Sequence, residues 1–256
     1  MARPGPQGLL GGLAAPWRGF KLLAAHPRLW PAALAPFLIN LGLFILFFWF
    51  TFSRFDHWVR SLVPGGEGWW WQLLVYLLLV LLVILLLAVE VYLFAVVGRI
   101  IAAPFLELLT RRTEALVAGG RPDLTGPGLW RSIWRVVVQE FKKLVLYLTL
   151  MSALLVLNLL PGLGNLLYTI LAGGLTCFFL ALEFLDYPLE RREFSLGRKL
   201  AYVWNLKFTG LAFGLAMLCL GLVPILNLAL LPLGAVGGTL LFLERPPADE
   251  GAGEAG

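Results

Sequence analysis

Two long stretches without a charged residue dominate the second half of this sequence, and turn-forming residues interrupt each of them near its middle. Residues 144–182 are 39 consecutive positions without Asp, Glu, Lys or Arg, and residues 208–243 are 36 such positions. The interruptions read "LLPGLGNLL" and "GLVPILNLALLP", so both place a proline and an asparagine between apolar runs. The sequence therefore predicts two similar helical hairpins, over about 144–185 and 208–243.

The length of each stretch limits how it can sit in a membrane. Two full crossings and a turn need about 44 residues, at about 20 residues per helix, and both stretches are shorter than that. Each hairpin is therefore either a pair of short spans or a re-entrant hairpin whose tip stops inside the membrane. Irregular backbone at that depth is tolerated only where it is buried in protein or lines a wet cavity.

The composition of the whole chain is also that of a membrane protein. Hydrophobic residues make up 60% of the sequence and charged residues 14%, and the mean hydropathy is +0.86; soluble domains carry about 25% charged residues. Two further spans are predicted, at about 31–53 and 69–98, with tryptophans 69–71 as an aromatic anchor at the membrane surface. We expect a single membrane domain over residues 16–244, between disordered tails at 1–15 and 245–256.

The basic residues indicate the orientation of the chain. Eight Lys and Arg residues lie in 99–143 and five in 191–207, but only two lie between the first two spans. The positive-inside rule then makes the basic face cytoplasmic, with amphipathic helices on it and both termini inside. This explains the net charge of +5 without nucleic acid as a partner. Arginine, alanine and glycine usage hints at a bacterial source, and hence at the cytoplasmic (inner) membrane.

Few residues are available for catalysis or for metal binding. The chain has two histidines, His26 and His57, and two cysteines, Cys177 and Cys219, each of which lies in an apolar run. No hydrolase, zincin or phosphate-loop motif occurs, and "GLGN" has Asn165 where an intramembrane aspartyl protease needs an acid. We therefore expect no enzyme, no cofactor and no metal; an intramembrane hydrolase would have to depend on Asp186 or Glu183.

Polar groups at membrane depth are the remaining candidates for function. Such groups are costly in lipid and are functional-site candidates, although asparagines can also cap broken helices and acids can pair with nearby arginines at the interface. The helix after each hairpin tip is expected to start near residues 163–165 or 225–227, and its N-terminus favours an anion. The candidates for anion binding at the tips are Gly162, Gly164, Asn165 and Asn227, and the structural or pore-edge candidates are Asn40, Glu90, Glu183 and Asp186.

Several stretches resemble the family of the bacterial CysZ sulfate permeases and the eukaryotic etoposide-induced protein 2.4. They are "HPRLWPAALAPFLIN", "IIAAPFLELL", "EFKKLVLYL", "LEFLDYPLERREFSLG" and "GLVPILNLALLPLGAVGGTLLFLE", within residues 16–244. The resemblance implies two long transmembrane helices, two hemi-penetrating hairpins, homo-oligomers and the passage of sulfate inward for assimilation. The family's sulfate-binding stretch reads Gly-Leu-Arg after a proline, whereas Arg28, Leu29 and Trp30 follow Pro27 here. The resemblance thus adds Arg28 and Leu29 as anion-binding candidates, with the arginine two positions early.

These observations together predict an all-α integral membrane protein with two long transmembrane helices, amphipathic cytoplasmic helices and two re-entrant hairpins. The predicted function is a permease or channel-like protein for sulfate or a related small oxyanion, with membrane lipid and further copies of the chain as partners. The alternative is a non-transporting scaffold whose basic region, residues 99–143, binds anionic lipid or a protein partner.

Overall fold

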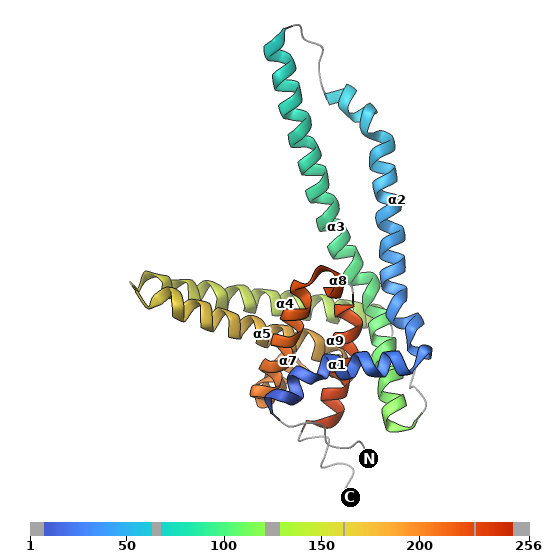
Figure 1. Cartoon of the computed structure of the whole chain (residues 1–256), viewed down its shortest axis with the longest axis vertical. Coiled ribbons are helices and arrows are strands. Elements are labelled where there is room, and N and C mark those ends of the chain that lie inside the picture. The colour runs from blue at the N-terminus through green and yellow to red at the C-terminus, as the bar shows by residue number, and fades with distance from the viewer. Residues whose placement is uncertain (1–7, 63–67, 121–128, 161, 228, 248–256) are drawn as a thin grey trace, which may run out of the picture. The chain divides into compact units, whose positions relative to one another are not determined.

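The computed structural model describes residues 8–62, 68–120, 129–160, 162–227 and 229–247. All regular structure in these ranges is helical, without a strand (Figure 1). The chain divides into two compact units: residues 31–105, called here the α2–α3 unit, and residues 1–30 with 106–256, called here the core unit. The protein is therefore all-α, with several long apolar helices.

The elements are α1 (Leu9–Ala25), η1 (Pro27–Leu29), α2 (Trp30–Leu62), α3 (Trp69–Ala118), α4 (Leu129–Leu155), η2 (Val156–Leu159), α5 (Gly164–Arg191), α6 (Leu196–Asn205), α7 (Phe208–Leu222), α8 (Pro224–Asn227) and α9 (Leu230–Glu244).

Two segments that are long and apolar enough to cross a membrane lie wholly or mostly in the α2–α3 unit. The first is Pro27–Phe50, most of which lies in α2, and the second is Trp69–Ala88 in α3, with 24 and 20 residues. At about 1.5 Å per residue they extend roughly 36 and 30 Å, which matches a hydrocarbon core of about 30 Å. Their large apolar side chains are exposed almost throughout. Such a surface requires an apolar surrounding, which a lipid bilayer provides.

Helix α3 is longer than the sequence predicts. A span ending near residue 98 and a separate amphipathic helix were expected, but α3 continues through Pro104 to Ala118. A proline removes one helical hydrogen bond, yet α3 is continuous through this position. The helix ends at Gly119, whose φ of +70° lies in the left-handed region, and Gly120 N–H donates to the Ala115 carbonyl at 2.9 Å. The end of α3 is thus set by a glycine cap rather than by the proline.

The core unit buries its apolar side chains between α1, α5, α6, α7 and α9. Helix α1 packs on α7 and α9, and α5 packs on the same two helices. Large side chains from different helices fill the centre, among them Phe184 of α5, Phe213 of α7 and Phe242 of α9, all at most 2% exposed. The rings of Phe184 and Phe213 meet edge to face, 6.4 Å apart. Residues close in space here are more than two hundred positions apart in sequence, as in the pair of Arg18 and Glu244, so this packing fixes the tertiary structure.

Close helix contacts in the core unit depend on glycines. A Cβ atom on Gly214 of α7 would lie 1.8 Å from the Cys177 carbonyl oxygen of α5, and one on Gly238 of α9 would lie 2.6 Å from the Phe184 carbonyl oxygen. Between membrane helices, small residues allow backbones to approach closely and gain van der Waals contact. These two glycines therefore set how closely α7 and α9 pack on α5.

The N-terminal segment corrects one expectation. Residues 1–15 were predicted to form a disordered tail, but α1 begins at Leu9 and Ala15 is fully buried. The reason is tertiary: a Cβ on Gly12 would lie 2.2 Å from the Thr209 carbonyl oxygen, so this segment packs directly on α7. Small residues look like an unstructured tail in sequence, yet here they allow a close helix contact. Residues 1–7 and 248–256 lie outside the described part of the chain.

The first hairpin consists of α4, η2 and α5, and the chain reverses between Leu160 and Gly164. Its apolar segments Val138–Leu159 and Gly164–Arg191 contain 22 and 28 residues and are long enough to cross a membrane. Tyr147 links the two helices, because its hydroxyl lies 3.3 Å from Thr176 Oγ1 and its ring packs edge-on against Phe179.

The second hairpin, α7–α8–α9, is shorter. Helices α7 and α9 contain 15 residues each, about 22 Å, which is less than the hydrocarbon core of about 30 Å. Helix α6 precedes α7 with a bend of 99° between them. The sequence pattern treats the two hairpins alike, but the helix lengths of the structure distinguish them.

Candidate functional site

The first predicted anion residues, Arg28 and Leu29, lie in η1, the turn that connects α1 to α2. Leu29 is 3% exposed and therefore packs inside the core unit, whereas the Arg28 side chain is exposed. The Arg28 carbonyl accepts a hydrogen bond of 3.1 Å from Arg112 Nη1. Trp30, which follows, donates its indole N–H to the Leu23 carbonyl at 2.9 Å. The turn is therefore held by side-chain bonds to backbone. It carries the exposed Arg28 side chain, and the Arg112 guanidinium binds its backbone.

At the first hairpin tip, the helix start agrees with the sequence prediction. Helix α5 begins at Gly164, after Gly162, whose φ is +85°. The Gly164 N–H already donates to the Leu160 carbonyl at 3.2 Å, and the Leu167 N–H donates to the Leu163 carbonyl at 3.0 Å. Asn165 is exposed in the first turn. The helix N-terminus thus has fewer backbone N–H groups to offer an anion than the sequence implies.

The second tip differs from the prediction. The helix was expected to start near residues 225–227, but α9 begins at Leu230, and Asn227 ends the four-residue helix α8. Asn227 is exposed, and its backbone N–H donates to the Val223 carbonyl at 2.9 Å. The proline and asparagine therefore form a short turn of their own before the returning helix, because Pro224 suits a first helical position.

The structure does not bring these candidates together within one chain. The tip of the α4–α5 hairpin lies at the outer end of that hairpin, far from the junction of α1 with α2 that carries Arg28 (Figure 1). Any anion path that uses both Arg28 and Asn165 would therefore extend over a long surface or use more than one copy of the chain.

Charged side chains from three helices meet in one place, and we call this group the ionic cluster. Asp186 of α5 lies between two lysines, with Lys143 Nζ at 2.6 Å from Oδ2 and Lys199 Nζ at 2.5 Å from Oδ1. Lys143 comes from α4 and is 6% exposed, and Lys199 comes from α6 and is fully buried. Lys143 has two further acidic neighbours, Glu140 at 2.5 Å and Glu183 at 3.5 Å. Lys199 pairs with Glu190 and donates a hydrogen bond of 2.6 Å to the Gln139 side chain.

The charges of the cluster indicate its role. Two lysines face four carboxylates, those of Glu140, Glu183, Asp186 and Glu190, so the cluster has no excess positive charge for an anion. Burial of a lysine is tolerated when it is paired and hydrogen-bonded. The cluster therefore connects α4, α5 and α6 and does not itself form an oxyanion site. The sequence suggested that Glu183 and Asp186 would pair with arginines; that prediction was wrong, because their partners are lysines.

The arginines that follow Asp186 have another acidic partner. Glu114, near the end of α3, pairs with Arg191 and lies 3.1 Å from Arg192 Nη1. The Arg192 guanidinium also lies over the Phe242 ring, 4.2 Å from its centroid. These contacts attach the last turns of α3 to the end of α5 and to α9. They also explain why Arg191 and Arg192 do not neutralise Asp186.

Two of the candidate polar residues are not tested by the geometry. The side chains of Asn40 and Glu90 lie outside the described part of the chain, although both residues belong to helices. Their role at the edge of a pore stays a prediction.

Sequence reasoning missed the lysines of the ionic cluster. A signal existed for Lys199: it lies on the same helical face as Tyr202 and Val203, which are buried. A cation on the apolar stripe of an amphipathic helix indicates a buried acidic partner. No such signal existed for Lys143, which looks like one more basic residue next to Lys142 at the start of an apolar run.

Comparisons with known proteins show which family this chain belongs to. The family model described as sulfate transporter CysZ/etoposide-induced protein 2.4 matches residues 15–232. Proteins named sulfate transporter CysZ from Salmonella paratyphi A and Salmonella enteritidis are 31% identical over 228 residues, which is 89% of this chain and 89% of each relative. The protein of the same name from Salmonella typhimurium has the same identity and coverage. This chain therefore belongs to the sulfate transporter CysZ/etoposide-induced protein 2.4 family.

Proposed function

We propose that this protein transports sulfate, or a related small oxyanion, across the inner membrane of a bacterium. The observation that carries the proposal is the match to relatives named sulfate transporter over 89% of both chains. The all-α structure supports it, because long helices with exposed apolar side chains suit a chain embedded in lipid. The distribution of basic residues supports cytoplasmic termini.

Arg28 is the residue proposed to attract the anion to the mouth of the path. Its side chain is exposed at the turn before α2, and Arg112 of α3 donates a 3.1 Å bond to the backbone carbonyl of the same residue. Guanidinium groups bind the oxygens of a tetrahedral dianion through paired N–H donors and do not lose their charge. Arg28 provides attraction for sulfate at this turn, with the half-buried Arg112 as a further positive charge bound to the turn backbone. The exposure of Arg28 to water keeps the binding weak enough for release.

The hairpin tips are proposed as a second contact, through the Asn165 and Asn227 side chains. Both are exposed, and the structure places them at reversals of apolar helices. Because one chain keeps Arg28 far from the first tip, we propose that a complete path is formed by a homo-oligomer.

The proposal is tested by sulfate uptake into liposomes that contain the purified protein. Arg28→Ala is expected to reduce the initial rate of radiolabelled sulfate uptake at low sulfate by about tenfold, the value of one charged hydrogen bond. The matched control is Lys142→Ala, which removes an equally exposed positive charge from α4 and is expected to leave the rate unchanged.

Two results would count against the proposal in different ways. If the wild-type protein gives more uptake than protein-free liposomes and Arg28→Ala gives the same rate as wild type, this residue is not part of the path. Wild-type uptake equal to that of protein-free liposomes, for a monodisperse protein, would contradict transport and favour a scaffold that binds lipid or a protein partner.

A further inference from the structure

Two hollows lie next to each other on the outer face of helix α6. The first has a volume of about 300 Å³ and the second about 330 Å³. Ala201 and Asn205 line both of them, so the hollows adjoin along one side of the helix. The opposite side of α6 carries Lys199 and Val203 into the protein interior. The outer face of α6 is thus the part of this helix that is available to a ligand.

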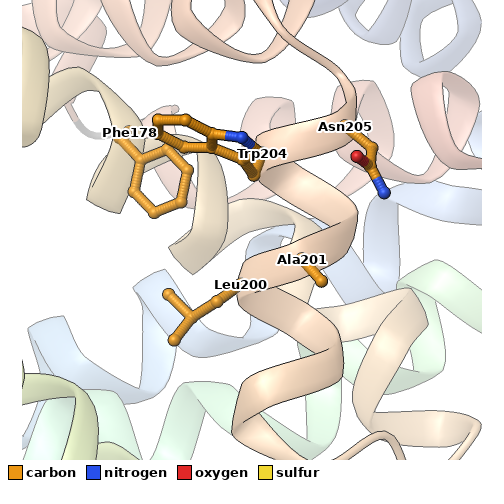
Figure 2. Close-up of a pocket in the computed structure, with 5 residues that line it drawn as sticks. All are labelled: Phe178, Leu200, Ala201, Trp204 and Asn205. Atoms are coloured by element: carbon orange, nitrogen blue, oxygen red, sulfur yellow. The ribbon is translucent and has the colours of Figure 1, made fainter.

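The first hollow is apolar and aromatic. Phe178 of α5 and Trp204 of α6 form its walls together with Leu200, as Figure 2 shows. The two aromatic rings meet edge to face at 6.3 Å, and Trp204 is 75% exposed. A tryptophan that is exposed beside an apolar surface is typical of the membrane interface, where the ring contacts acyl chains and the indole N–H stays near the headgroups.

The second hollow is cationic. It is lined by Arg198 of α6 and by Arg245, the first residue after α9. The Arg198 guanidinium lies over the Phe194 ring, 4.4 Å from its centroid. The Tyr202 hydroxyl donates to the Arg245 carbonyl at 2.9 Å. The aromatic ring thus positions the Arg198 guanidinium, and the tyrosine fixes the backbone from which the Arg245 side chain extends.

The orientation of α6 fits a position at the membrane surface. Helix α7, which follows, is almost entirely apolar, and α6 bends away from it by 99°. A helix that exposes an arginine and a tryptophan and precedes an apolar helix at a right angle lies along the interface while the next helix enters the lipid. The cationic hollow would then lie at headgroup level and the aromatic hollow at the level of the acyl chains.

We propose that this face of α6 binds one anionic phospholipid, with its phosphate at Arg198 and Arg245 and an acyl chain against Phe178 and Trp204. A guanidinium pair matches the phosphate oxygens, and burial of acyl methylenes on the aromatic walls adds hydrophobic free energy. The two shared lining residues, Ala201 and Asn205, allow one amphiphile to occupy both hollows. A free oxyanion would use the arginines alone, so the aromatic hollow favours a lipid. This site is independent of the proposed sulfate path.

Lipid binding is tested by native mass spectrometry of the delipidated protein titrated with phosphatidylglycerol or phosphatidylcholine. We expect a preference for phosphatidylglycerol in the wild type. Arg198→Gln with Arg245→Gln should weaken phosphatidylglycerol binding about 25-fold, or about fivefold for each arginine. The matched control, Lys21→Gln with Lys142→Gln, removes the same charge from exposed positions and should keep wild-type binding. Equal binding by wild type and the arginine variant would overturn the proposal.

A second pair of variants separates a lipid from a free anion. Trp204→Ala should weaken phosphatidylglycerol binding about fivefold through lost apolar contact. Trp17→Ala, which removes a tryptophan that is 58% exposed elsewhere in the core unit, should have no effect. An unchanged Trp204→Ala variant, with phosphatidylglycerol displaced by inorganic phosphate, would show an oxyanion site and contradict the lipid site. Gel filtration and melting temperature establish that each variant is folded.

Discussion

Asp186→Asn is expected to lower the apparent melting temperature of the detergent-solubilised protein by about 10 °C. The substitution keeps the shape of the side chain but removes the charge between Lys143 and Lys199, whose ammonium groups lie at 2.6 and 2.5 Å. Breaking a buried ion pair by removing one partner costs about 3–5 kcal/mol, and 1 kcal/mol shifts the melting temperature by roughly 2–4 °C in a chain of this size. Thermal unfolding followed by gel filtration measures the change.

The comparison for Asp186→Asn is Glu107→Gln, which makes the same chemical change in a carboxylate that water reaches. Glu107 pairs with Arg111 at 2.6 Å within one helix; Glu107 is 48% exposed, although Arg111 is buried. The loss of Glu107 is expected to lower the melting temperature less than the loss of Asp186, because the exposed carboxylate interacts more weakly. The double variant Asp186→Asn with Lys199→Gln should lose less stability than the sum of the losses in the two single variants. Additive losses would show that the two groups do not interact, and a wild-type melting temperature for Asp186→Asn would contradict the structural role of the ionic cluster.

Gly214→Ala is the second substitution with a large expected effect. The new methyl group would lie 1.8 Å from the Cys177 carbonyl oxygen, and because that oxygen belongs to the backbone of α5, the two helices must separate. Overpacking of this kind typically costs about 1–3 kcal/mol. We expect a lower melting temperature and, in a Cys219→Ser background, faster labelling of Cys177 by a maleimide, since this thiol is only 7% exposed in the native packing.

Gly173→Ala is the matched control on the partner helix, α5. A Cβ at Gly173 meets no atom within 4 Å, and alanine is favoured over glycine in a helix by about 0.5–1 kcal/mol. This variant is expected to be as stable as wild type or more stable. If Gly214→Ala were equally harmless, α5 and α7 would not be in the close contact that the structure shows.

The sequence predicted those features that depend on local composition. The membrane class follows from apolar runs of sufficient length, and the reversals of both hairpins were predicted from turn-forming residues in the middle of such runs. The family assignment follows from short motifs around Asp186 and from the hairpins. None of these inferences requires knowledge of which helices touch.

The sequence failed where a contact between distant segments decides the outcome. Residues 9–15 look like a tail, and only the approach of Gly12 to the Thr209 carbonyl makes them part of a packed helix. The continuity of α3 could not be predicted, because Pro104 is a helix breaker by local rules and is accommodated here within one helix.

The sequence by itself determined that this chain is an all-α membrane protein with two interrupted apolar hairpins, since hydrophobic length and turn chemistry are properties of consecutive residues. Only the tertiary structure decided which charges meet. Asp186 pairs with Lys143, 43 positions before it, and with Lys199, 13 positions after it. Arg191 and Arg192 pair with Glu114 instead. The physical reason is that a buried ion pair needs partners at hydrogen-bond distance, and that distance is set by how α4, α5 and α6 pack and not by the spacing of the residues along the chain.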